Sequence, residues 1–116
     1  MKIGELSRRT GVSQRLLRYY EQQGLLTTRR APSGYRYYEP DAVTVVAQIR
    51  NLLAAGLNTE TIRTVLPCAR GELPVLEPCP NLLATLRAEL TALDDRLTCL
   101  QETRTALATY LAATES

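Results

Sequence analysis

The chain has 116 residues, 45% of them hydrophobic and 22% charged, which is enough for about one small globular domain. Its net charge of +2 is unevenly distributed: residues 1–56 carry nine Lys or Arg against four Asp or Glu, and residues 57–116 carry five against eight. The basic half predicts an anionic partner. Nucleic acid fits better than a membrane surface, because that half lacks a basic amphipathic helix with a continuous apolar face.

The N-terminal sequence Met-Lys-Ile-Gly-Glu-Leu-Ser has no apolar segment of the kind found in signal peptides, and no apolar run approaches a membrane span. We therefore expect a cytoplasmic protein without membrane contact. In that compartment the three cysteines are expected as thiols, and an odd count leaves at least one unpaired in any intramolecular scheme.

Two short helices with a tight turn are predicted at the N-terminus. The first covers Ile3–Arg9 and ends at Gly11, since glycine favours the position after a helix. Ser13 is a good N-cap for the second, which ends at Gly24. This is the helix-turn-helix pattern.

The second helix has two distinct faces when it is plotted at 100° per residue. The polar, cationic face holds Arg15, Arg18, Tyr19 and Gln22. The apolar face holds Leu16, Leu17 and Tyr20. A helix with these faces can lie in a groove of DNA while it is anchored to a small core.

A hairpin is predicted next, because aromatic and β-branched residues flank the turn sequence Pro32-Ser33-Gly34. In a strand, Arg36 and Tyr38 share one face, and Tyr35 and Tyr37 share the other. A hairpin directly after a helix-turn-helix is a wing, whose arginines would lie along the DNA backbone. We expect Tyr20 and Tyr35 to belong to the core.

Two further helices are predicted, one from Pro40 to Gly56 and one over Thr59–Leu66 that is capped by Asn58. A structured linker follows, containing Pro67, Pro74, Pro78 and Pro80 together with Cys68 and Cys79. The predicted organisation is therefore a DNA-binding domain over 1–66, a linker over 67–79 and a long helix over 80–114.

The long helix carries leucines at alternating steps of three and four, with one polar interruption at Arg104. The seam consists of Leu83, Leu86, Leu90, Leu93, Leu97, Leu100, Leu107 and Leu111. A helix over Pro80–Thr114 would be about 50 Å long and could not bury this seam within so small a domain. We expect a homodimer; the alternative is a helix that folds back on its own N-terminal domain.

In this order, the segments resemble the MerR family of bacterial transcription regulators. The match is carried by Ile3-Gly4-Glu5-Leu6-Ser7, Gly11-Val12-Ser13, Leu17-Arg18-Tyr19-Tyr20-Glu21, Gly24-Leu25-Leu26, Gly34-Tyr35-Arg36-Tyr37-Tyr38 and Asp41-Ala42-Val43. The resemblance is close over residues 1–66, whereas over residues 80–114 only the overall pattern matches. The resemblance implies a mainly α fold, a winged helix-turn-helix followed by an antiparallel coiled coil between two protomers.

The resemblance also implies a double-stranded, pseudo-palindromic promoter site and action with RNA polymerase through distortion of the spacer DNA. By position, Gln14 and Arg15 would contact bases, and Arg18 and Tyr19 would contact the backbone or groove. The wing residues Arg36 and Tyr38 would contact phosphate, and Tyr37 is also expected to contact DNA. Arg63 or Arg50 is expected to add phosphate contacts, although Arg50 also fits a solvated or dimer-contact position.

The signal to which such a regulator would respond is less well defined than its DNA contacts. The chain lacks the cysteine-containing loop that metal-sensing members carry after the long helix, contains no His, and leaves no room for a large effector domain. Three interpretations of the cysteines stay open: small buried residues without a role, a redox- or electrophile-sensitive pair of Cys68 and Cys79, or a soft-metal site with Cys99 as a third ligand. We expect no resident cofactor.

The sequence also bears on two other functions. An architectural or excisionase-like DNA-binding protein could use the same fold without promoter control. An enzyme is not expected, because the sequence lacks His, a phosphate-binding glycine loop and paired carboxylates on one helix face; Asp94 and Asp95 are adjacent and point to different sides.

Overall fold

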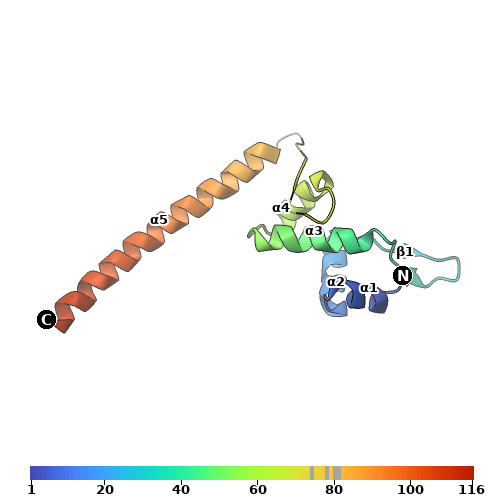
Figure 1. Cartoon of the computed structure of the whole chain (residues 1–116), viewed down its shortest axis with the longest axis horizontal. Helices are drawn as coiled ribbons and strands as arrows, with labels where there is room; N and C mark the ends of the chain where they lie inside the picture. Colours follow the sequence, from blue (N-terminus) through green and yellow to red (C-terminus); the bar gives the residue numbers. More distant parts are fainter. Residues whose placement is uncertain (74, 78, 80–81) are drawn as a thin grey trace. The chain divides into compact units, whose positions relative to one another are not determined.

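The computed structural model describes residues 1–73, 75–77, 79 and 82–116. The chain divides into two compact units, Met1–Pro78 and Cys79–Ser116. In order, the first unit holds α1 (Ile3–Thr10), α2 (Gln14–Gln22), β1 (Arg29–Arg30), β2 (Arg36–Tyr37), α3 (Ala42–Ala54), α4 (Thr59–Val65) and the 3-10 helix η1 (Leu66–Cys68). The second unit holds α5 (Leu82–Glu115). The predicted mainly α fold with a two-stranded wing and a long C-terminal helix is confirmed (Figure 1).

The helix-turn-helix is formed by α1 and α2. Gly11 ends α1 with a φ of 71°, a left-handed conformation that favours glycine, and its N–H donates to the Ser7 carbonyl. Ser13 caps α2 as predicted, because its Oγ accepts a hydrogen bond from the Leu16 N–H at 3.2 Å. Both ends of the turn are therefore fixed by local sequence.

The core of the first unit lies where α3 crosses the helix-turn-helix, with α1 packed against both α2 and α3 (Figure 1). Its largest fully buried side chains are Tyr20, Leu6, Leu17, Ile49, Ile62, Val46 and Val65. They come from α1, α2, α3 and α4, so one small core holds α2 in place; α2 is the helix predicted to lie in a groove of DNA and is called the recognition helix below. Burial of each large aliphatic side chain contributes about 1.5–3 kcal/mol.

The wing is a short antiparallel hairpin in which Arg30 pairs with Arg36 across β1 and β2. Its turn is closed by a hydrogen bond from the Gly34 N–H to the Ala31 carbonyl at 2.8 Å. Gly34 has a φ of 92°, which a residue with a Cβ rarely adopts. The predicted hairpin is confirmed, with two-residue strands.

Helix α4 begins as predicted, because Asn58 Oδ1 accepts from the Thr61 N–H at 2.9 Å. It ends one residue earlier than expected, at Val65, and passes directly into η1, which contains Pro67. Helix α3 begins at Ala42, not at Pro40. Three of the four linker prolines, Pro74, Pro78 and Pro80, lie outside the described residues, as does Asn81.

Helix α5 has 34 residues and is about 50 Å long at the usual rise per residue. It was predicted over Pro80–Thr114; the described helix starts at Leu82 and ends at Glu115. Apart from Leu86, which is half-buried, the seam leucines are exposed, from 38% for Leu93 to 69% for Leu107.

Candidate nucleic-acid interface

Helix α2 presents one polar face and buries the other. Its exposed side chains include Gln14, Arg15, Arg18 and Tyr19. Leu17 and Tyr20 are 0% and 2% exposed and anchor the helix to the core. Leu16, expected on the buried face, is 40% exposed, because the anchored face is narrower than the helical projection suggested.

Three groups from the segment around the wing converge on Glu21 of α2. The Thr28 hydroxyl donates to Oε1 at 2.8 Å, the Tyr38 hydroxyl donates to Oε2 at 3.2 Å, and the Arg36 guanidinium forms an ion pair with the same carboxylate. The carboxylate therefore joins the recognition helix to the wing. This role of Glu21 was not predicted from the sequence, although Glu21 is the only acidic residue between Leu6 and Tyr38.

Tyr38 departs from its expected role as a phosphate contact. Its side chain is 3% exposed, and its hydroxyl is directed to Glu21. Burial raises the pKa of the Tyr38 hydroxyl above its ordinary value, and the positive charges of Arg36 and Arg18 partly offset this. Tyr38 thus serves as a core residue that secures the wing.

Tyr35 departs in the opposite direction, because it was expected in the core and is 51% exposed. Its ring lies 6.2 Å from the Tyr37 ring at 55° and receives the Lys2 ammonium 5.4 Å from its centroid. Tyr20 is buried as expected, and burial raises its hydroxyl pKa, with Arg50 lowering it in part.

A cavity of about 310 Å³ opens beside α2 and β2. It is lined by Lys2, Ile3, Arg18, Glu21, Tyr35, Arg36 and Tyr38. Three of these side chains are cationic and one is acidic, so the surface favours an anion. The reciprocal bonds between the backbones of Met1 and Tyr38, both 2.6 Å, hold the start of the chain at this edge.

The wing carries two further arginines. Arg29 forms an ion pair with Glu39 at 3.1 Å, and Arg30 donates to the Gly34 carbonyl at 3.2 Å. Both residues are exposed. With Arg36, they give the hairpin three cationic side chains next to the recognition helix.

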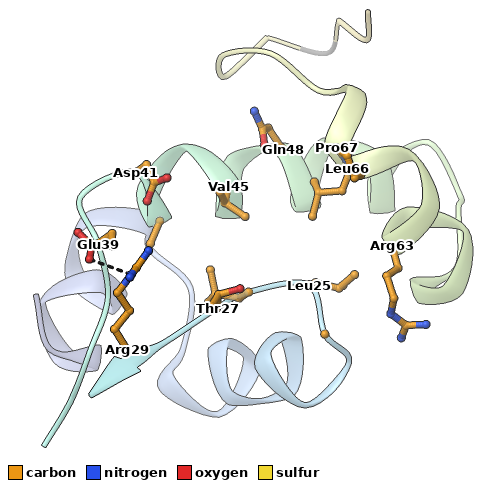
Figure 2. A pocket seen from close by; sticks show the side chains of 13 residues that line it. Leu25, Thr27, Arg29, Glu39, Asp41, Val45, Gln48, Arg63, Leu66 and Pro67 are labelled. Carbon is orange, nitrogen blue, oxygen red and sulfur yellow. Dashed lines mark ion pairs between the residues drawn. The ribbon is translucent and has the colours of Figure 1, made fainter. Parts of the chain in front are cut away.

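A second cavity, of about 460 Å³, separates the segment after α2 from α3 and η1 (Figure 2). Leu25, Val45 and Leu66 supply apolar lining, and the Arg29–Glu39 ion pair closes one end. Arg63 stands at the other end and points from α4 toward the chain just before Leu25 (Figure 2).

Arg63 and Arg50 both bind backbone carbonyls. Arg63 Nε and Nη2 donate to the Gln23 carbonyl at 2.9 and 2.5 Å. Arg50 Nη1 donates to the Thr10 carbonyl at 3.3 Å. Neither bond was anticipated from the sequence, because both partners lie 40 residues away along the chain.

The segment after α4 is fastened to α3. An isolated bridge pairs Ala69 with Leu76, and Gln48 Nε2 and Asn51 Nδ2 donate to the Gly71 and Glu72 carbonyls at 3.0 and 2.9 Å. Part of the predicted linker is therefore packed against the DNA-binding unit.

The cysteines differ in state. Cys68 is 3% exposed at the end of η1, whereas Cys99 is a free, exposed thiol on α5. Cys68 and Cys79 are each in the disulfide-bonded form, so the expectation of thiols is wrong for these two residues. Among residues 1–73, 75–77, 79 and 82–116, no three His, Cys, Asp or Glu side chains group in a way that could hold a metal ion. Within the same ranges, no helix has the length and apolarity needed to cross a membrane.

Comparisons with known proteins agree with this architecture. The model of the MerR HTH family of regulatory proteins matches residues 1–68. The nodulation protein NolA of Bradyrhizobium elkanii is 35% identical over 97 residues, which cover 83% of this chain and 44% of NolA. This chain thus spans less than half of NolA.

Other relatives match over more of their own length. The heavy metal-dependent transcription regulator 2 of Rhizobium meliloti is 32% identical over 90% of this chain and 71% of that protein. A crystal structure described as that of a MerR family transcriptional regulator from Listeria monocytogenes has a TM-score of 0.57 and 27% identity. The alignment covers 100% of this chain and 86% of that one. The family model covers more than half of the chain, and the chain therefore belongs to the MerR family of helix-turn-helix regulatory proteins.

Proposed function

We propose that the chain is a sequence-specific DNA-binding transcriptional regulator that acts as a homodimer. The observation that carries the proposal is the exposed face of α2, where Gln14, Arg15, Arg18 and Tyr19 stand opposite the buried anchors Leu17 and Tyr20. Such a face offers both cationic and hydrogen-bonding groups to a DNA groove.

The position of each side chain on the interface separates proposed base contacts from proposed backbone contacts. Gln14 and Arg15 lie at the N-terminal end of α2, the end that contacts base edges in helix-turn-helix proteins, and both can form bidentate hydrogen bonds with purines. Arg18 and Tyr19 lie further along the helix and suit the sugar-phosphate backbone. Arg36 and Tyr37 on the wing extend the same surface to a neighbouring phosphate.

Dimerisation is proposed through α5. A seam of eight leucines on a helix of 34 residues, most of them exposed, is a large apolar surface for a single chain. A second copy would cover it, and two-fold symmetry would present two recognition helices to a pseudo-palindromic site. The antiparallel arrangement, the distortion of spacer DNA and the action on RNA polymerase are carried over from the family resemblance.

The signal is proposed to be oxidation of Cys68 and Cys79. A peroxide can take two electrons and two protons from a pair of thiols, which forms the S–S bond and releases two waters from hydrogen peroxide. The proposal is supported by the disulfide-bonded form of both residues and by the position of Cys68 at the end of η1, the 3-10 helix that follows α4. A soft-metal site is less well supported, because the described residues form no group of three ligands.

Selection of duplexes from a random-sequence library tests DNA recognition directly. We expect a two-fold related motif, with binding whose logarithm falls linearly with the logarithm of salt concentration. Recovery of unrelated sequences would refute sequence-specific recognition. Footprinting together with RNA polymerase then separates a regulator, which changes open-complex formation, from an architectural or excisionase-like protein, which does not.

A further inference from the structure

Each helix of the helix-turn-helix ends at a carbonyl that is bound by an arginine from a supporting helix. Arg50 of α3 donates to Thr10, the last residue of α1, and Arg63 of α4 donates to Gln23, the C-cap of α2. The two bonds differ in strength. Arg50 uses one nitrogen at 3.3 Å, whereas Arg63 uses two nitrogens at 2.9 and 2.5 Å.

The end of α2 explains why a carbonyl is available there. The Gly24 N–H bonds to the Glu21 carbonyl at 3.0 Å and the Leu25 N–H bonds to the Tyr20 carbonyl at 2.9 Å, which is the Schellman arrangement. The Gln23 carbonyl lies beyond these two bonds, at the end of the helix where partial negative charge accumulates. A guanidinium is well suited to bind it, because charge and hydrogen bonding act together.

We infer that Arg63 is a positioning residue, which fixes the direction of the recognition helix by holding its C-terminal end against α4 and does not contact DNA. The inference rests on the proposed function, in which α2 contacts bases. A second bond joins the same two helices, from the Thr59 hydroxyl to Gln23 Oε1 at 3.3 Å.

Arg63 holds α2 at its C-terminal end, so a small rotation of α2 about that end would displace the side chains at its N-terminal end. Helix α2 has nine residues, so its two ends are about 13 Å apart. Gln14 and Arg15 lie at the end opposite to Arg63. A tilt of roughly 5° about the clamped end would therefore shift these side chains by about 1 Å, enough to disturb bidentate hydrogen bonds with a base.

Gly24 provides an independent way to disturb the hydrogen bonds between Arg63 and the Gln23 carbonyl, which we call the Arg63 clamp. Its φ is +74°, and a Cβ at this position would lie 3.3 Å from Arg63 Nε. Gly56, which follows α3, has a similar φ of +83°, but a Cβ there would meet nothing within 4 Å. The pair Gly24→Ala and Gly56→Ala therefore introduces similar backbone strain, and only the first pushes against Arg63.

The test compares the full-length chain with its Arg63→Ala, Arg63→Lys, Gly24→Ala and Gly56→Ala variants. Each binds two duplexes of equal length, one selected from a random library by the unaltered chain and one with the same bases scrambled. Dissociation constants are measured over a series of salt concentrations. Urea unfolding shows which variants are folded under the assay conditions.

For Arg63→Ala we expect about a tenfold loss of affinity for the selected duplex, corresponding to the loss of one charged hydrogen-bonding interaction, with the salt slope unchanged. Affinity for the scrambled duplex stays the same, because the phosphate contacts remain. Arg63→Lys recovers part of the loss. Gly24→Ala reproduces the loss of discrimination, and Gly56→Ala does not.

Three results would overturn the inference. A salt slope lower by about 0.9 per bound protomer would make Arg63 a phosphate contact. An equal loss on both duplexes at unchanged slope would indicate a general effect on folding, and unchanged discrimination would show that the clamp is not needed. If Arg63→Ala is unfolded, the Lys and glycine variants decide. If the unaltered chain does not distinguish its selected duplex from the scrambled one, the proposed function fails instead.

Discussion

The Tyr38 hydroxyl, at the end of the wing, donates a hydrogen bond to Glu21 Oε2 on the recognition helix, with 3.2 Å between the two oxygens. The same carboxylate accepts from Thr28 and pairs with Arg36. The wing and the helix proposed to contact bases are therefore connected through one acidic side chain, which is 17% exposed. A carboxylate at a surface that attracts DNA would repel phosphate, but here its charge is offset by Arg36.

Glu21→Ala should lower the free energy of unfolding by about 1–3 kcal/mol, because the hydroxyls of Thr28 and Tyr38 lose their acceptor. Urea unfolding measures the change. Glu5→Ala is the matched control, since Glu5 forms an ion pair with Arg9 on the exposed surface of α1, and it should change stability by less than about 1 kcal/mol. Equal effects of the two substitutions would contradict the role assigned to Glu21.

Alkaline pH should destabilise the protein through Tyr38 and Tyr20. Burial raises the pKa of both hydroxyls above the ordinary value of 10, so the folded state holds these protons more tightly than the unfolded state. The stabilisation is fully present below about pH 10 and is lost as the pH rises through the folded-state pKa values. Urea unfolding at a series of pH values should show this decline. Tyr38→Phe should make it shallower, and an increase in stability above pH 10 would contradict the assignment.

Arg18→Ala should weaken binding to selected and scrambled duplexes alike and should lower the salt slope, because Arg18 is assigned to phosphate. Arg15→Ala should relax the preference at particular base pairs, by about 1–3 kcal/mol for each bidentate contact. Titrations at several salt concentrations, with single-base variants of the selected duplex, separate the two effects. If Arg18→Ala leaves the salt dependence of binding unchanged, Arg18 does not contact phosphate.

Leu97→Glu should convert the proposed dimer to a monomer, because a charge would then lie in the centre of the leucine seam. Thr109→Glu places the same side chain on α5 outside that seam and should leave the dimer intact. Sedimentation equilibrium measures the masses. A monomer in the unaltered protein, or equal effects of the two substitutions, would refute dimerisation through this face.

The double variant Cys68→Ser/Cys79→Ser should abolish any change in operator affinity between peroxide-treated and reduced protein. Cys99→Ser should leave that change intact, because Cys99 is a free thiol on α5. Native mass spectrometry of both states would show the loss of two hydrogen atoms on oxidation or the mass of a bound metal. If the double variant responds to oxidant and metal like the unaltered protein, both sensing hypotheses fail.

The elements were determined largely by local sequence. Ser13 and Asn58 cap α2 and α4, Gly11 and Gly24 end α1 and α2, and Gly34 closes the wing, since each effect needs only neighbouring residues. The amphipathic spacing of α2 likewise identified Arg15, Arg18 and Tyr19 as exposed and Leu17 and Tyr20 as buried.

Only the tertiary structure decided which tyrosines are buried and what the isolated charges bind. Tyr35 and Tyr38 are three residues apart in one hairpin, and the packing of α2 and the start of the chain covers Tyr38 and leaves Tyr35 exposed. Arg63 is bound to a carbonyl 40 residues away, an interaction that depends on how α4 packs against α2. Local sequence encodes helix ends and faces because these are short-range effects, whereas long-range hydrogen bonds depend on packing that no local pattern contains.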